Sequence, residues 1–234
     1  MKTIITPIYN EEYLIPFFIK QHYWADKFVF LIDSDTNDNS INEIIKNISQ
    51  DQAYEIIQFH FGFDDLKMIG LTNEIIKDYD SDYFVCLDCD EFIIKEPEFI
   101  NNVEQVYFYQ MYQAESEKAY LDNRPLEVQR KWGIIDKMYL KPCIVKKTAN
   151  PIMTVGKHTV IINNKCFYPH ESYGYYCGMH LNKLNYDFYK HRFILRNKKI
   201  SQENKKNGFG KQYFDIDLVS LRKEFFNNKL IKLF

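Results

Sequence analysis

The first 90 residues alternate short apolar runs with amphipathic stretches, and this alternation most constrains the fold. Residues 2–6, 28–32, 54–59 and 83–87 are the apolar runs, and each is predicted to be a strand. The amphipathic stretches between them, each predicted to be a helix, begin at Asn10, Ser40 and Asp64. An order of β-α-β-α-β-α-β predicts parallel strands joined by right-handed crossovers. We therefore expect an α/β fold with a central, mostly parallel sheet flanked by helices.

Polar residues follow three of these predicted strands. They form the clusters 7–11, 33–38 and 88–91. Ligands of parallel sheets bind beyond the carboxyl ends of the strands, so the three clusters are expected to share one site. The chain has no Gly-x-Gly-x-x-Gly and no Walker-type lysine loop, which argues against an ordinary dinucleotide or P-loop site.

The cluster that follows residues 83–87 places three acids within four residues: Asp88, Asp90 and Glu91. If the strand continues, Asp88 and Asp90 point to the same side, because side chains alternate along a strand. Two neighbouring carboxylates at a buried strand end require a cation, and a divalent metal ion with oxygen ligands meets that need. The alternative is a solvated acidic turn.

The rest of the chain has a weaker pattern. Strands are predicted at 106–112, at 141–146 as an edge strand, and at 154–162 with His158 inside; 114–132 is predicted to cross the surface, and helices are predicted at 186–195 and 216–234. We assign residues 1–195 to one domain. Residues 196–234 are expected to form a basic loop and a C-terminal helix packed on that domain or extending it.

Composition limits the partners and the compartment. The chain is 46% hydrophobic with a net charge of −2, but residues 183–234 contain 13 Lys and Arg against 5 Asp and Glu. No run approaches the ~18 apolar residues of a membrane span. Five cysteines without a repeating framework are typical of a reducing cytoplasm. We expect a cytoplasmic protein without a nucleic-acid partner, whose basic C-terminus either contacts the inner membrane face or simply packs.

Three motifs resemble those of a known enzyme family. Thr6-Pro7-Ile-Tyr9-Asn10-Glu11-Glu12, Leu31-Ile-Asp33 and Leu87-Asp88-Cys-Asp90-Glu91-Phe92 resemble family 2-type glycosyltransferases of the GT-A fold. The Asp-x-Asp-Glu-Phe form is closest to a bacterial glycosyltransferase-like family 2 branch related to family 92. The resemblance covers residues 3–195 and is looser in the second half.

The resemblance implies roles for individual residues. Those near the nucleotide would be Pro7, Tyr9, Asn10, Glu11, Asp33, Lys67 and Asp88. The ligands of Mn²⁺ or Mg²⁺ would be Asp88 and Asp90, with His180 as the first choice and His158 as the second choice of a later histidine. An inverting enzyme also needs a carboxylate base for the acceptor hydroxyl. The usual later Glu-Asp pair is absent, which leaves Glu91, Glu171 and Asp136 as candidates.

The resemblance also implies a reaction: metal-dependent transfer of a sugar from a nucleotide donor, by default a UDP-sugar, to a glycan or glycolipid hydroxyl. Bacterial surface polysaccharide synthesis, of lipopolysaccharide or capsule, is the expected context. A nucleotidyltransferase is the first alternative, although it would normally show a Gly-rich loop near the first strand. A non-catalytic nucleotide- or glycan-binding protein of the same fold is the second. The sequence does not select the sugar, the acceptor or the oligomeric state.

Overall fold

A ten-stranded mixed sheet forms the centre of the protein. The computed structural model describes residues 1–234, apart from the side chain of Gln212. Strands β1 (Lys2–Ile8), β2 (Lys27–Asp33), β3 (Ala53–Phe59) and β4 (Tyr83–Cys86) lie in the order β3-β2-β1-β4, and all are parallel. The predicted α/β fold with a parallel central sheet is therefore confirmed.

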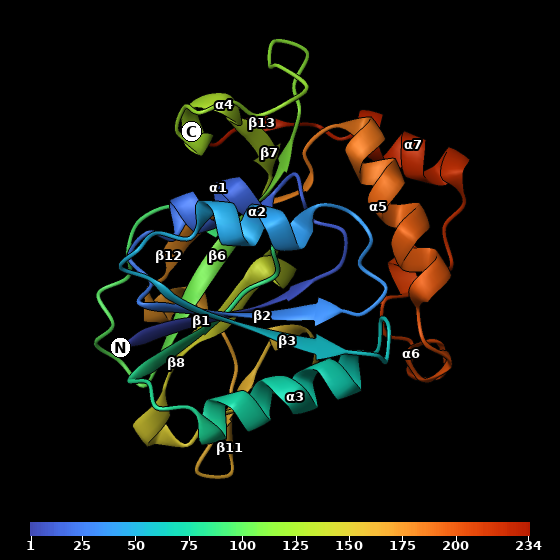
Figure 1. Ribbon diagram of the computed structural model, residues 1–234. Helices are drawn as coiled ribbons and strands as arrows, with labels where there is room; N and C mark the ends of the chain where they lie inside the picture. The colour runs from blue at the N-terminus through green and yellow to red at the C-terminus, as the bar shows by residue number, and fades with distance from the viewer.

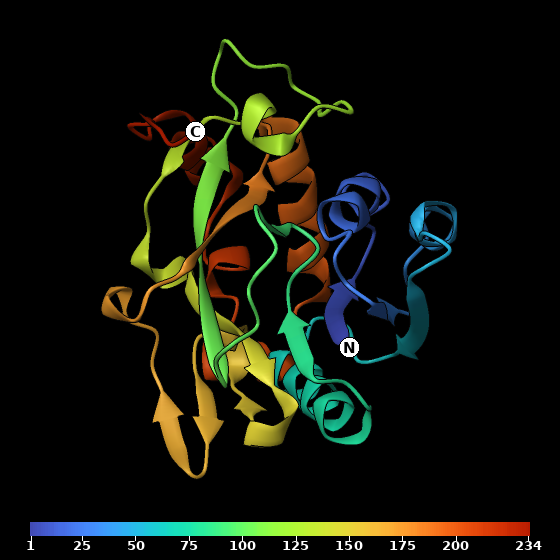
Figure 2. The ribbon, with the colours of Figure 1, turned by 90° about the vertical axis from the view of Figure 1, so that its left-hand side faces the viewer.

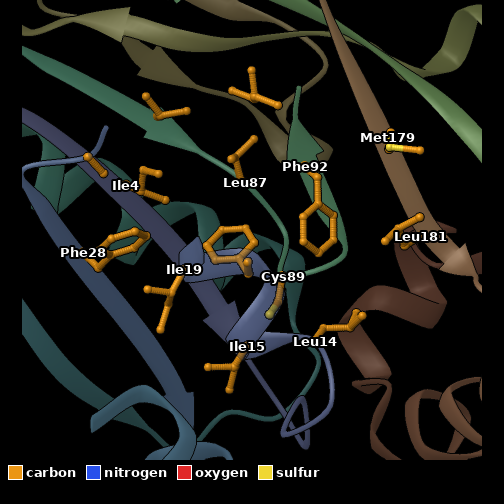
Figure 3. Close-up of a cluster of buried hydrophobic side chains, with 14 of the residues drawn as sticks. Ile4, Leu14, Ile15, Ile19, Phe28, Leu87, Cys89, Phe92, Met179 and Leu181 are labelled. Atoms are coloured by element: carbon orange, nitrogen blue, oxygen red, sulfur yellow. The ribbon is translucent and has the colours of Figure 1, made fainter. Parts of the chain in front are cut away.

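Helices cover both faces of this parallel block. Helices α1 (Ile15–Gln21) and α2 (Ser40–Asn47) lie on one face, and α3 (Asp65–Asp78) lies on the other (Figure 1). The core under α1 contains Ile15, Ile19, Phe28 and Phe92 (Figure 3). Ile15 and Ile19 are four residues apart, so they lie on the same side of α1, and that apolar side packs against the sheet.

The second half of the chain extends the sheet with antiparallel strands. These are β5 (Glu91–Ile93), β6 (Val103–Tyr112), β7 (Trp132–Ile134), β8 (Leu140–Lys146), β12 (Tyr176–Lys183) and β13 (Ile231–Lys232), although β12 pairs with β6 in parallel (Figure 2). The expectation of an edge strand at 141–146 is wrong, because β8 pairs with β4 on one side and β6 on the other. Pro142 is tolerated there since the β6 pairing shifts register opposite it, between Glu104 and Val106.

Three other expectations need correction. The predicted strand at 154–162 is a 3₁₀ turn, η3 (Val155–Lys157), followed by β10 (Val160–Ile162), which joins β9 (Ile152–Met153) and β11 (Lys165–Phe167) in a small second sheet. The segment 114–132 contains α4 (Leu126–Gln129), and the Arg130 side chain after it is fully buried. The helix predicted at 216–234 is α7 (Leu218–Phe226) followed by β13.

The C-terminal helices pack against the edge of the sheet at which β2 and β3 end (Figure 1). They are α5 (Tyr186–Lys199), α6 (Gln202–Asn207) and α7; the remaining short 3₁₀ turns are η1 (Lys137–Tyr139), η2 (Lys147–Ala149), η4 (Glu171–Tyr173) and η5 (Lys211–Tyr213). Leu221 and Phe225 of α7 share a buried cluster with Tyr189 and Phe193 of α5. Within the described residues, no helix is both long and apolar enough to span a membrane.

Candidate functional site

The three polar clusters lie at one edge of the parallel block. Glu11 follows β1, Asp33 ends β2, and Asp90 follows β4. These three strands are parallel, so their carboxyl ends, and the three acids with them, lie at the same edge of the sheet. Asn10 joins the first two clusters: its side-chain oxygen accepts from the Asn37 backbone N–H at 2.9 Å, and its amide nitrogen lies 3.1 Å from the Asn37 side-chain oxygen. Asn10 has φ of 54°, a conformation that Asn tolerates better than most residues.

Helix α5 brings three cations to this edge. Arg192, Arg196 and Lys199 are spaced by four and three residues, which places them on one side of a helix. We call these three residues the α5 basic row. Asn185 caps the start of α5, its side chain accepting from the Phe188 backbone N–H at 2.8 Å, and so fixes where the row begins.

Each member of the α5 basic row meets acids from the strand ends. Arg192 donates to Oε2 of Glu11 through Nη1 and to Oδ2 of Asp90 through Nη2, both at 2.7 Å. The Arg196 guanidinium lies 3.6 Å from the same Asp90 oxygen. Lys199 pairs with Asp33 at 2.8 Å and Asp35 at 2.6 Å, and its ammonium lies 4.6 Å from the centre of the Tyr9 ring. One helix therefore neutralises acids from three strand ends.

Asp90 is enclosed. Its side chain is 1% exposed, and His180 Nε2 lies 3.4 Å from the oxygen that Arg192 contacts. Burial raises the pKa of Asp90, but the charges of Arg192 and His180 outweigh burial and hold that pKa well below its ordinary value. The second oxygen, Oδ1, is buried without a hydrogen-bond partner. Asp90 is therefore ionised, and one of its two carboxylate oxygens, Oδ1, has no partner.

Asp88 is the accessible member of the pair. Strand β4 ends at Cys86, so strand alternation does not set the direction of Asp88 and Asp90, contrary to expectation. Asp88 Oδ1 accepts from Nζ of Lys157 at 2.7 Å, and its side chain is 40% exposed. Although burial acts in the opposite direction, the charges of Lys157 and Lys141 lower the pKa of Asp88. The two aspartates thus meet different cations from different elements.

Glu91 has a structural environment. It is 0% exposed and forms a salt bridge with Lys141, and its Oε2 accepts from the Asp88 backbone N–H at 2.9 Å. A base must reach the acceptor hydroxyl, directly or through one water. An enclosed carboxylate bound to Lys141 does not offer that access, so the structure argues against the predicted catalytic role of Glu91 and assigns it to holding the acidic turn.

The other two candidate bases lie on short exposed turns. Asp136 precedes η1 and accepts from the Met138 backbone N–H at 3.0 Å. Glu171 begins η4, and its carboxylate lies 3.7 Å from Lys137. Tyr139 of η1 lies beside His180, with ring centres 4.9 Å apart and ring planes tilted by 46°, so the turn that Asp136 precedes reaches the acidic site through Tyr139. Nothing in the described contacts brings Glu171 to the aspartates.

The two candidate histidines have different surroundings. The Gln110 amide nitrogen lies 2.5 Å from Nδ1 of His180. The other ring nitrogen of His180, Nε2, faces Asp90 at 3.4 Å, so neither ring nitrogen is free for a metal. His158 follows η3 and is half-buried; burial, and next the charge of Lys141, lower its pKa.

Pro7, Lys67 and Glu11 are the other residues that were predicted to lie near the nucleotide. Pro7 pairs with Leu31 inside the parallel block. The Lys67 side chain is exposed on the first turn of α3. The Lys67 backbone N–H donates to the side chain of Asp64, which caps the helix. Burial raises the pKa of the enclosed Glu11 to about 7, against the opposing charge of Arg192.

The two aspartates offer oxygen atoms to a divalent cation, but the protein does not provide a complete ligand set. Among the residues that the structure describes, no three His, Cys, Asp or Glu side chains gather as a metal-binding group. Asp90 Oδ1 has no partner, and Asp88 uses Oδ1 for Lys157 while its side chain remains accessible. Mg²⁺ typically uses one or two carboxylates together with substrate phosphates. Asp88 and Asp90 are the pair that would hold such a cation.

Sequence reasoning missed the cations of this site. Charge balance alone showed that the C-terminal part was basic. The spacing of Arg192, Arg196 and Lys199 by four and three residues was an available signal, but the predicted helix ended at residue 195, whereas α5 continues to Lys199. Lys157 could not be found in this way, because its position depends on η3, where Lys157 has φ of 59°. Lys141 was recognised only as part of a strand.

Comparison with known proteins gives distant similarities in structure only. No family model matches the sequence, and no curated protein matches it. S. aureus TarS 1–349 is 11% identical, with a TM-score of 0.42 over 97% of this chain and 72% of that one. Glucosyl-3-phosphoglycerate synthase from Mycobacterium tuberculosis, in complex with Mn²⁺, UDP and phosphoglyceric acid, is 13% identical, with a TM-score of 0.36 over 68% of this chain and 60% of that one.

The inositol-1-phosphate CTP transferase from T. maritima is also similar, at 9% identity and a TM-score of 0.33 over 64% of this chain and 71% of that one. These TM-scores are below 0.5 and do not assign a family or a function to the chain.

Proposed function

We propose that this protein transfers a sugar from a nucleoside-diphosphate donor, a UDP-sugar by default, to a hydroxyl group of a glycan or glycolipid. The observation that carries the proposal is the convergence of acids from three parallel strand ends with the α5 basic row and Lys157. Such an edge of a parallel sheet is where ligands bind. Paired acids and cations there suit a ligand that has polar nucleoside and anionic diphosphate parts.

In the proposed reaction the bond between the anomeric carbon and the diphosphate oxygen breaks, and a bond from the acceptor oxygen forms. The nucleoside diphosphate leaves with the bonding electrons, and the hydroxyl proton passes to a carboxylate base. Arg192, Arg196 and Lys157 would stabilise the charge that develops on the leaving diphosphate. Asp88 and Asp90 would hold Mn²⁺ or Mg²⁺, which supplies further positive charge to the diphosphate when bound. Asp136 is the better-placed base.

Asp33, Tyr9 and Asn10 would contact the nucleoside. Their placement at the ends of β1 and β2 supports this role, because Tyr9 offers an aromatic face and Asp33 offers carboxylate oxygens to hydroxyl donors. Lys199 holds Asp33 in position.

The test is release of nucleoside diphosphate from a panel of nucleotide-sugars, with Mn²⁺ or Mg²⁺ added. We expect one donor to be hydrolysed slowly and transferred faster when a glycan acceptor is present. Calorimetry of UDP with Mn²⁺ should show binding to the wild type and at least tenfold weaker binding to Asp90→Ala, while the exposed control Asp80→Ala binds normally. Binding of UDP that is independent of metal in both proteins would contradict metal-dependent transfer.

The products separate the alternatives. A nucleotidyltransferase would release inorganic diphosphate from a nucleoside triphosphate and a sugar phosphate. A non-catalytic binding protein would bind the nucleotide-sugar and leave it intact.

We further propose that the protein is a cytoplasmic enzyme of lipopolysaccharide or capsule synthesis and that it contacts the inner membrane face peripherally. The outer side of α7 supports membrane contact: Val219 is 65% and Phe226 is 59% exposed, beside Arg222 and Lys223. Apolar and basic side chains together favour an anionic lipid surface. Co-sedimentation with anionic vesicles, lost in Phe226→Glu, would test this contact.

A further inference from the structure

Arg192 holds two acids that the proposed donor would need. Its guanidinium bridges Glu11 and Asp90, each at 2.7 Å. All three side chains are buried, with exposed fractions of 5% for Arg192, 8% for Glu11 and 1% for Asp90. While this bridge is closed, Asp90 is therefore shielded from solvent and already has Arg192 as its counter-ion.

We propose that Arg192 is a displaceable counter-ion of Asp90, which passes from the carboxylate to the diphosphate when a divalent cation and the diphosphate bind together. This inference rests on the proposed function. In the closed state Arg192 and Asp90 satisfy each other. In the bound state the cation would satisfy Asp90 and the phosphate oxygens would satisfy Arg192.

Charge balance supports an exchange in which both ligands enter together. In the closed state each of the two aspartates has its own cation: Arg192 contacts Asp90 at 2.7 Å, and Lys157 contacts Asp88 at 2.7 Å. A cation or a diphosphate that entered alone would break the Arg192–Asp90 pair and leave one partner charged and buried, which is costly. A cation–diphosphate pair brings both charges at once, so each freed group regains a partner.

Unpaired atoms beside the bridge support the same inference. Asp90 Oδ1, Arg192 Nε and Gln110 Oε1 are buried without hydrogen-bond partners, and these residues belong to one contact chain through His180. Buried polar atoms normally have partners. Two of the unpaired atoms belong to the two side chains that would exchange, one an acceptor for a cation and one a donor for a phosphate oxygen.

The experiment measures Mn²⁺ alone by electron paramagnetic resonance, and UDP by calorimetry with Mn²⁺ held at saturation. In Arg192→Met we expect Mn²⁺ alone to bind at least tenfold more tightly than in the wild type, because Asp90 has lost its competitor. We expect UDP, in the presence of Mn²⁺, to bind at least tenfold more weakly, because the phosphate has lost its cation. These opposite changes identify an exchange, since a purely structural role of Arg192 would weaken both.

Lys198→Met, an exposed change on the same helix, is the matched control and should alter neither affinity. Arg192→Lys serves if Arg192→Met fails to fold by circular dichroism; it retains the charge but lacks the planar fork that bridges two acids, so smaller changes of the same signs are expected. Unchanged Mn²⁺ affinity in a folded Arg192 variant would overturn the exchange. Failure of the proposed function has a different result: no nucleotide-sugar is bound or cleaved by the wild type under any metal condition.

Discussion

Arg192 Nη2 lies 2.7 Å from Asp90 Oδ2, and this contact joins residues 102 positions apart in the chain. It connects α5 to the turn after β4, and through Glu11 to the end of β1. The acids at the strand ends are therefore organised by the C-terminal helix as well as by the sheet. Helix α5 therefore supplies part of the positive charge of the site.

The two aspartates should respond differently to substitution. Asp88→Asn should lower donor turnover about 100-fold, the scale of losing one group that stabilises developing charge, and change the free energy of unfolding by about 1 kcal/mol or less, because its side chain is partly exposed. Asp90→Asn should also cost about 3–5 kcal/mol of stability, because Arg192 remains buried with a lost partner. Nucleoside diphosphate release and urea unfolding measure the two effects, with Asp80→Asn as the control. Full stability of Asp90→Asn would show that the Arg192 contact contributes little.

Glu91 should behave as half of a buried ion pair with Lys141. Glu91→Gln should cost about 3–5 kcal/mol in urea unfolding, because it leaves the Lys141 charge buried without its partner. Adding Lys141→Met to Glu91→Gln should recover part of that loss, which a double-mutant cycle would quantify. A stable Glu91→Gln protein with turnover reduced more than 100-fold would instead support the catalytic role predicted from the sequence.

The parallel block was predictable because its information is local. The apolar runs from β1 to Cys86 are set by periodicity, and the polar clusters directly follow the ends of the strands. The starts of α2 and α3 agree with the prediction to within one residue, whereas α1 begins at Ile15 and not at Asn10, whose φ of 54° is not helical. The partners of those clusters were not predictable in the same way. Arg192 and Lys157 meet Asp90 and Asp88 only because α5 and η3 fold back to the sheet edge, and periodicity contains no information on such tertiary contacts.

Local misreadings in the second half have a similar cause. Residues 141–146 contain a proline and two lysines, which are typical of an edge strand. The strand is internal because a register shift accommodates Pro142 and because Glu91 neutralises Lys141. Both compensations come from other strands, so the sequence of β8 and its immediate neighbours could not reveal them.

Gly178 and Gly70 should respond in opposite directions to alanine. A Cβ at Gly178 of β12 would lie 2.4 Å from Cδ1 of Phe108, so Gly178→Ala should cost about 1–3 kcal/mol through overpacking. At Gly70 of α3 nothing lies within 4 Å of the added carbon, so Gly70→Ala should stabilise by about 0.4–1 kcal/mol. Urea unfolding of both variants makes the comparison. A neutral Gly178→Ala would mean that the Phe108 ring moves aside at little cost.

His22 should make stability depend on pH. Its ring is fully buried between α1 and β5: Nδ1 lies 2.9 Å from the Phe18 carbonyl oxygen, and Nε2 accepts from the Ile93 backbone N–H at 3.1 Å. Burial lowers the pKa of His22 from 6.5 to about 3, although the Phe18 hydrogen bond acts in the opposite direction. Between these values the unfolded chain binds a proton that the folded chain does not, so the stability that depends on His22 is fully present above pH 6.5 and falls as the pH drops toward 3.

At about 1.4 kcal/mol per pH unit, lowering the pH from 6.5 to 5 should cost about 2 kcal/mol through His22. Glu11, whose raised pKa makes stability change in the opposite direction over this interval, is common to all the variants, so the effect of His22 is read as a difference between proteins. In urea unfolding at both values, the wild type and the exposed control His60→Gln should lose about 2 kcal/mol relative to His22→Gln. An equal loss in His22→Gln would mean that other groups produce the pH dependence.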